Sequence, residues 1–66
     1  MIPNKPGTYL VKCEESGGDW TQVRILKTAS RTGESILMVD DPDIGSRLLD
    51  DYHNALTDIE WKLIGW

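Results

Sequence analysis

The clearest pattern in this 66-residue chain is an alternation of apolar and charged positions within residues 58–66. One face carries Ile59, Trp61 and Leu63, and the other carries Glu60 and Lys62. A period of two residues is the signature of a β-strand with one buried face. The pattern predicts a C-terminal strand on which the rest of the fold packs, with Trp61 as its anchor in the core.

Two earlier segments have the composition of strands. In residues 8–13, Tyr9 and Val11 share a face that we expect to point inward, because Lys12 marks the wetter face. Residues 20–28 carry apolar side chains on both faces, as is common where a sheet curls on itself. Both segments therefore join the C-terminal strand in the predicted sheet.

A fourth strand is predicted over residues 35–40, where four apolar residues follow one another. An unbroken apolar run is typical of a central strand buried on both faces. Turn residues separate the strands: residues 16–19 contain two glycines, and Gly33 is placed for a left-handed conformation in the next loop. The run Asp40 to Asp43 is expected to form a turn after the fourth strand.

Residues 43–56 fit two interpretations. Strand alternation favours a strand across residues 46–52, which is the slightly preferred prediction. Apolar residues at helical spacing instead favour a short helix within residues 43–54, which Asp43 would cap. Gly45 weakens the helix by about 1 kcal/mol relative to alanine.

These segments predict a mainly β protein that forms a single domain over residues 1–66. Four or five short antiparallel strands cannot hide a second apolar face in a flat sheet. The expected fold is therefore a small curved antiparallel sheet, or a barrel of the Src-homology-3-like kind. A chain of this size buries only about 60% of the surface that its unfolded form exposes, so self-association is one expected source of stability.

The composition of the chain limits the kinds of covalent and metal sites that it can form. The single cysteine, Cys13, excludes an internal disulfide, and one cysteine with one histidine excludes the usual structural zinc sites. Neither a signal peptide nor a run of about 20 apolar residues is visible, so we expect a cytoplasmic protein without a membrane span. No cofactor is expected.

Charge is unevenly distributed along the chain. Residues 1–35 have a balance of +1, whereas residues 36–66 have a balance of −5. Phosphate contacts dominate the affinity for nucleic acids, so the acidic half argues against that function and favours a basic protein partner. The alternative function, a small-barrel nucleic-acid-binding protein, would use Trp20, Arg24, Lys27 and Arg31 for stacking and phosphate contacts.

Three sets of residues are candidates for chemical sites. His53 beside acidic residues resembles a general base, but a turn with packed side chains explains the segment better. Asp40, Asp41 and Asp43 lack the spacing of a calcium loop, because Pro42 interrupts them and no closing glutamate follows. Cys13, on the same face as Val11, is expected to be a small buried hydrophobe. The sequence therefore predicts neither an enzyme nor a metal site.

A contact surface is predicted instead, because tryptophan is frequent at binding hot spots and the chain ends on one. It would combine aromatic and acidic residues of the C-terminal half: Trp66, Tyr52, Asp50, Asp51 and His53.

The chain also resembles small β-rich proteins encoded by phages and prophages. Such proteins open with Gly-x-Tyr-Leu-Val, as residues 7–11 do. They continue with a strand led by tryptophan, as in residues 20–26, and close with Ile-x-Trp, as in residues 59–61. The resemblance implies an accessory or inhibitor protein that binds and occludes a protein of the host cytoplasm, and it carries over no site residues.

Overall fold

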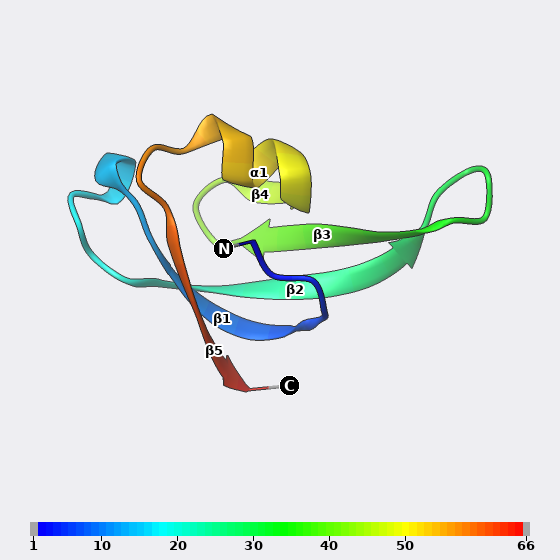
Figure 1. Cartoon of the computed structure of the whole chain (residues 1–66), viewed down its shortest axis with the longest axis horizontal. Helices are drawn as coiled ribbons and strands as arrows, with labels where there is room; N and C mark the ends of the chain where they lie inside the picture. The colour runs from blue at the N-terminus through cyan, green and yellow to red at the C-terminus, as the bar shows by residue number, and fades with distance from the viewer. Residues whose placement is uncertain (1, 66) are drawn as a thin grey trace.

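A five-stranded antiparallel sheet dominates the computed structural model, which describes residues 2–65 (Figure 1). The elements in chain order are β1 (Gly7–Lys12), the 3-10 turn η1 (Glu14–Ser16), β2 (Thr21–Ala29), β3 (Ser35–Asp41), β4 (Gly45–Leu48), α1 (Leu49–Ala55) and β5 (Glu60–Gly65). The strand order β4-β3-β2-β1-β5 leaves the sheet open, with β4 and β5 at its edges. The predicted curved antiparallel sheet is confirmed, in its open form and not as a closed barrel.

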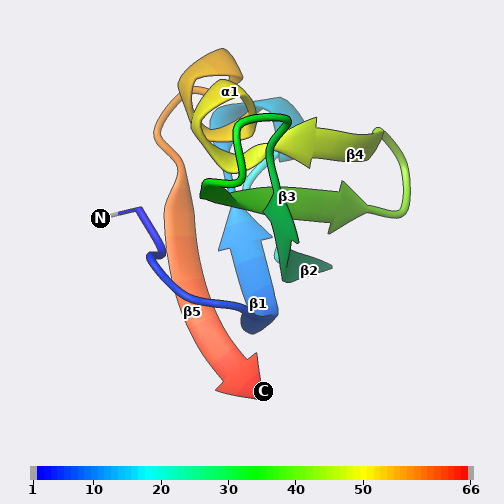
Figure 2. The same cartoon turned by 90° about the vertical axis from the view of Figure 1, so that its right-hand side faces the viewer.

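One face of the sheet carries the core. Strand alternation places Tyr9, Val11, Val23, Ile25 and Val39 on this face, where all five are buried. In Figures 1 and 2, α1 lies across the end of this face that β3 and β4 form. Leu49 and Tyr52 complete the buried cluster from α1, and Ile2, Leu37, Leu56, Ile59 and Trp61 pack around it.

The core confirms several predictions made from alternation. Tyr9 and Val11 point inward, Cys13 is buried, and Trp61 packs against the core while staying half-buried. The edge of the Tyr9 ring meets the Trp61 ring at a centroid distance of 6.2 Å. Aromatic pairs in this geometry contribute about 0.5–1.5 kcal/mol beyond the area they bury. Trp61 is therefore an aromatic anchor, as predicted.

The segment after β3 differs from the preferred prediction of a strand across residues 46–52. The strand prediction holds for residues 46–48 of β4. The short helix of the alternative is found at residues 49–55, and its N-cap is Leu48 and not Asp43, which lies in the turn before β4. Leu49 and Tyr52 are three residues apart, which puts both on the helix face that meets the core. Asp50 and Asp51 lie in the first helical turn, where carboxylates are favoured by the helix dipole.

The prediction that residues 35–40 are buried on both faces is wrong. Within β3, only Val39 and Asp41 are buried, whereas Ile36, Leu37 and Met38 are half-buried. The reason is that the described chain covers one face of the sheet only, which leaves the other face, here called the outer face, in contact with solvent. The strand also continues through Asp41 before the turn at residues 42–44.

The connection between β1 and β2 is more structured than a tight hairpin turn. Residues 14–16 form η1, and Gly17 and Gly18 then adopt positive φ values of 71° and 83°. Two contacts hold η1 to the segment before β5: the Glu14 amide donates to the Thr57 carbonyl, and the Thr57 amide donates to the Glu15 carboxylate. These bonds join segments that are about 40 residues apart in the sequence.

Gly33 has the predicted left-handed conformation, with φ of 85°. Within residues 2–65, no helix has the length and apolar character needed to cross a membrane.

Candidate functional site

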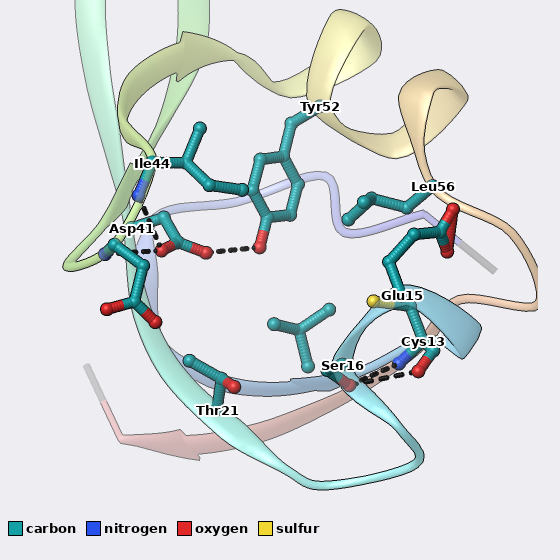
Figure 3. Close-up of a pocket in the computed structure, with 10 residues that line it drawn as sticks. Cys13, Glu15, Ser16, Thr21, Asp41, Ile44, Tyr52 and Leu56 are labelled. Carbon is teal, nitrogen blue, oxygen red and sulfur yellow. Dashed lines mark hydrogen bonds between the residues drawn. The ribbon is translucent and has the colours of Figure 1, made fainter.

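The most distinctive polar group of the fold is the carboxylate of Asp41, the buried acid at the end of β3, which is only 5% exposed. Its Oδ1 accepts hydrogen bonds from the amides of Asp43 and Ile44, at 2.8 and 3.1 Å. Its Oδ2 accepts a 2.6 Å bond from the Tyr52 hydroxyl (Figure 3). Three donors therefore compensate a charge whose burial without partners would be strongly unfavourable.

Burial is the largest cause that raises the pKa of Tyr52, and the hydrogen bond to Asp41 and the negative charge of Asp41 act in the same direction. The phenol therefore stays protonated and donates its hydrogen to the carboxylate. A neutral donor held in this way fastens α1 to the turn after β3, and it is the opposite of an activated nucleophile.

A cavity of about 170 Å³ opens beside this pair, between η1, the turn after β3 and α1 (Figure 3). Its buried walls come from Val11, Cys13, Asp41 and Tyr52. Its exposed residues are Glu15, Asp43 and Ile44. An apolar interior bordered by carboxylates is suited to a side chain that is apolar along its stem and positively charged at its end.

A second cavity of about 310 Å³ adjoins the first and shares Ile44, Tyr52 and Leu56 with it. Arg47, Asp51 and Ala55 complete its lining. We call the two adjoining cavities the α1 hollow. Ile44 stands between them with 46% of its surface exposed, so the hollow is part of the accessible surface and not a closed core void.

Two carboxylates of the α1 hollow are held by hydrogen bonds from the chain itself. Each oxygen of Asp41 already accepts a hydrogen bond. The Glu15 carboxylate accepts the Thr57 amide, which is the main cause that lowers the pKa of Glu15. Within the part of the chain that the structure describes, no cluster of three or more histidine, cysteine or acidic side chains is placed to hold a metal ion. The α1 hollow is therefore an accessible hollow with exposed carboxylates at its border.

His53 has a structural contact outside the α1 hollow. Its Nδ1 accepts a 3.1 Å hydrogen bond from Nε1 of Trp61, and the two rings stack at an interplanar angle of 16°. Buried tryptophan needs a partner for its indole N–H, and His53 supplies it. The half-buried histidine therefore helps to fix β5 against α1.

The predicted contact surface is divided by the structure. Asp50 and Asp51 are exposed on α1, and Trp66 lies outside the described residues. Tyr52 is 4% exposed and its hydroxyl is bonded to Asp41, so only the part of its ring that lines the two cavities is open to a contact. The physical reason is helical spacing, which turns Tyr52 inward together with Leu49 and leaves the two aspartates outside.

The four residues of the nucleic-acid alternative do not form one groove. Trp20 and Arg24 are exposed on the outer face, and Lys12 Nζ lies 5.0 Å from the centroid of the Trp20 ring. Lys27 points to the opposite face by strand alternation, and Arg31 lies in the loop between β2 and β3.

Sequence reasoning missed Asp41, Ile44 and Leu56 as parts of a binding surface. The sequence around Asp41 predicts a turn, because its neighbours Asp40, Pro42 and Asp43 are typical of solvent-exposed turns. One signal for its role is present: a tyrosine on the inner side of a short helix needs a buried acceptor for its hydroxyl. Comparisons with protein-family models, curated proteins and solved structures find no match to this chain.

Proposed function

We propose that this chain is a non-enzymatic protein-interaction module that binds and occludes a protein partner through the α1 hollow. The observation that carries the proposal is the pair of adjoining cavities that share Ile44, Tyr52 and Leu56 and are bordered by exposed carboxylates. An accessible hollow with apolar walls and a few polar groups at its border is the usual form of a binding site.

The apolar contribution comes from Ile44, Leu56 and the ring of Tyr52. Ile44 is exposed, Leu56 is half-buried, and the Tyr52 ring is held rigidly by its bond to Asp41. A rigid aromatic wall loses little conformational entropy when a partner binds. An apolar side chain of the partner that enters the hollow would cover these groups and act as an anchor.

The charged contribution comes from Glu15, Asp43 and Asp51, all exposed at the two cavities. Asp50 is exposed on the same helix, and Arg47 is the cation that lines the hollow. The excess of carboxylates fits the net charge of −4 and attracts a basic partner, for which it mainly increases the association rate and the specificity. The partner segment is therefore basic and carries at least one apolar anchor.

The resemblance of residues 7–11, 20–26 and 59–61 to phage- and prophage-encoded proteins supplies the biological setting of the proposal. In that setting, the partner is a protein of the host cytoplasm, and binding covers a surface that the host protein needs.

Selection from a random-peptide library on the immobilised protein tests the proposal. We expect enrichment of peptides in which lysine or arginine neighbours an apolar residue. Ile44→Ser should abolish the enrichment, whereas Leu26→Ser should preserve it, because Leu26 is equally exposed (43% against 46%) but lies on the outer face. Enrichment that survives Ile44→Ser, or that favours acidic peptides, would contradict the proposal.

The charged border has its own matched pair of variants. Asp43→Asn removes a carboxylate that lines the hollow, whereas Asp19→Asn removes an exposed carboxylate that does not. We expect Asp43→Asn to weaken a selected peptide several-fold at low salt and Asp19→Asn to change little. Equal effects of the two variants would mean that net charge alone, and not the hollow, attracts the peptide.

Single-stranded nucleic acid is the alternative partner, and the contact between Lys12 and the exposed Trp20 ring is the observation that favours it. An exposed aromatic ring beside a cation is a stacking platform for bases. A gel-shift series with a single-stranded oligonucleotide at low salt separates the two functions. Retardation that Trp20→Ala removes would favour nucleic acid, and its absence at micromolar protein would remove this alternative.

A further inference from the structure

Within residues 2–65, no strand pairs with the outer backbone edge of β5. β5 pairs with β1 on one side and is the last strand of the sheet on the other (Figure 2). Leu63 and Ile64 are 39% and 46% exposed along it. An edge strand presents unpaired backbone donors and acceptors, and another strand is their natural partner.

The two faces of β5 differ in character: one carries apolar side chains and the other carries charged ones. Trp61 lies opposite Val11, and Leu63 lies opposite Tyr9, so both belong to the face that carries the core. Glu60 and Lys62 lie opposite Lys12 and Leu10 on the outer face. A strand that pairs with β5 must therefore match an apolar row on one face and an acid followed by a base on the other.

A second copy of β5, running antiparallel, meets both conditions in one register. With Trp61 placed opposite its symmetry mate, Glu60 of each copy lies opposite Lys62 of the other copy. The same register places Leu63 opposite Ile59, the half-buried residue that directly precedes β5. Both core faces then lie on the same side, and the two sheets join into one continuous sheet.

The two neighbouring registers each place like charges opposite one another at their centre. A pairing centred on Lys62 places that cation opposite its own copy, and a pairing centred on Glu60 does the same with two carboxylates. Like charges directly opposite one another are destabilising in a sheet. A lysine alone on an edge strand disfavours the addition of another strand. Here Glu60 lies two residues before Lys62, so the β5 edges of two copies have complementary charges.

We propose that β5 is a self-recognition strand through which two copies of this chain pair antiparallel about Trp61. The ion pair between Lys12 and Glu60, at 2.9 Å, leaves 61% of the Glu60 side chain exposed. In the dimer, Glu60 lies between Lys12 of its own copy and Lys62 of the second copy. The charges of these three neighbours on the outer face therefore alternate. The proposal is argued from the pairing of β5 and not from the α1 hollow, although Trp61 packs against the Tyr52 ring of that hollow at a centroid distance of 5.8 Å.

Sedimentation over a concentration series up to about 1 mM tests the proposal with variants that exchange the charges. We expect the wild type to form a dimer. Glu60→Lys and Lys62→Glu each place like charges opposite one another at both symmetric positions, and each should weaken the dimer about tenfold or more. An equimolar mixture of the two variants restores both attractive pairs, so it should form a heterodimer. Lys27→Glu makes the same charge change as Lys62→Glu, but on β2, and it should leave the dimer intact.

Isotope-filtered NMR on mixed labelled and unlabelled wild-type protein gives a second measurement that needs no variant. We expect contacts between the copies that connect Trp61 with Trp61 and Ile59 with Leu63. A wild type that stays monomeric, single variants that dimerise as well as the wild type, or contacts on another surface would each overturn the proposal.

Discussion

The Tyr52 hydroxyl donates a 2.6 Å hydrogen bond to Oδ2 of Asp41 and thereby joins α1 to the end of β3. Both side chains are at least 95% buried. The bond fixes the wall that the two cavities of the α1 hollow share, because the Tyr52 ring forms part of each. The stability of the fold and the shape of the proposed binding surface therefore depend on the same pair.

Tyr52→Phe should lower the free energy of unfolding by about 1–3 kcal/mol, because it leaves one oxygen of a buried carboxylate without its donor. Urea unfolding measures the change. Tyr9→Phe is the matched control: its hydroxyl donates to the carbonyl of Lys5, a backbone acceptor in a partly buried bond, and its loss should cost about 0.5–1.5 kcal/mol. A larger loss for Tyr9→Phe would show that the Asp41 pair is not the main polar support of the core.

The same pair determines how stability changes in alkali. The pKa of Tyr52 is raised above its ordinary value of 10.0, so the folded state holds the phenolic proton more tightly than the unfolded state. This contribution is complete below about pH 10 and is lost as the pH rises above it. We expect wild-type stability to fall as the pH rises above about 10, and the stability of Tyr52→Phe to fall less over the same range. Parallel losses in both proteins would contradict the assignment.

Gly7→Ala should destabilise the fold severely. Gly7 has φ of 154°, and a Cβ at this position would lie 2.7 Å from the carbonyl oxygen of Gly65. Strain and overlap together should cost more than about 2 kcal/mol. Gly18→Ala separates the two causes, since Gly18 also has positive φ but has open space around it, and strain alone costs about 1 kcal/mol there. Thermal unfolding of the two variants measures the difference, and equal losses would mean that the approach of β1 to β5 tolerates a methyl group.

The contact between η1 and the segment before β5 should titrate in acid. The bond from the Thr57 amide is the main cause that lowers the pKa of Glu15 below its ordinary value of 4.5. A lowered pKa means that the contact is complete above this value and is lost as the pH falls through the folded pKa. We expect the Thr57 amide resonance to titrate with a midpoint below 4.5, and Glu15→Ala to abolish this step. Glu14→Ala is the control, and a step that persists in Glu15→Ala would contradict the assignment.

Much of the sheet could be predicted from the sequence, because the alternation of apolar and polar residues corresponds directly to the two faces of a strand. Tyr9 and Val11 point inward as their spacing required, and Trp61 packs on the core as expected from residues 58–66. For a strand with one buried face, the spacing of its apolar residues therefore indicates which side chains are buried. The apolar run of β3 misled the prediction, since Ile36 and Met38 face an outer surface that nothing in the described chain covers.

The candidate site could not be predicted in the same way because it is tertiary. The burial of Asp41 depends on Tyr52, which is eleven positions away and reaches the carboxylate only because α1 begins at Leu49. The same holds for Ile44 and Leu56, which form one hollow only after α1 folds back over β3 and β4. Local composition indicated a solvent-exposed turn at Asp41 and carried no information about this packing.

The most direct test of the proposed function is an NMR map of the surface that a library-selected peptide contacts on the wild-type protein. We expect the largest amide shift changes at Asp43, Ile44 and Leu56, around the α1 hollow, with little change at Leu26 on the outer face. Shift changes confined to the outer face or to β5, or a library that yields no binding peptide, would contradict the proposal that the α1 hollow is where this protein holds its partner.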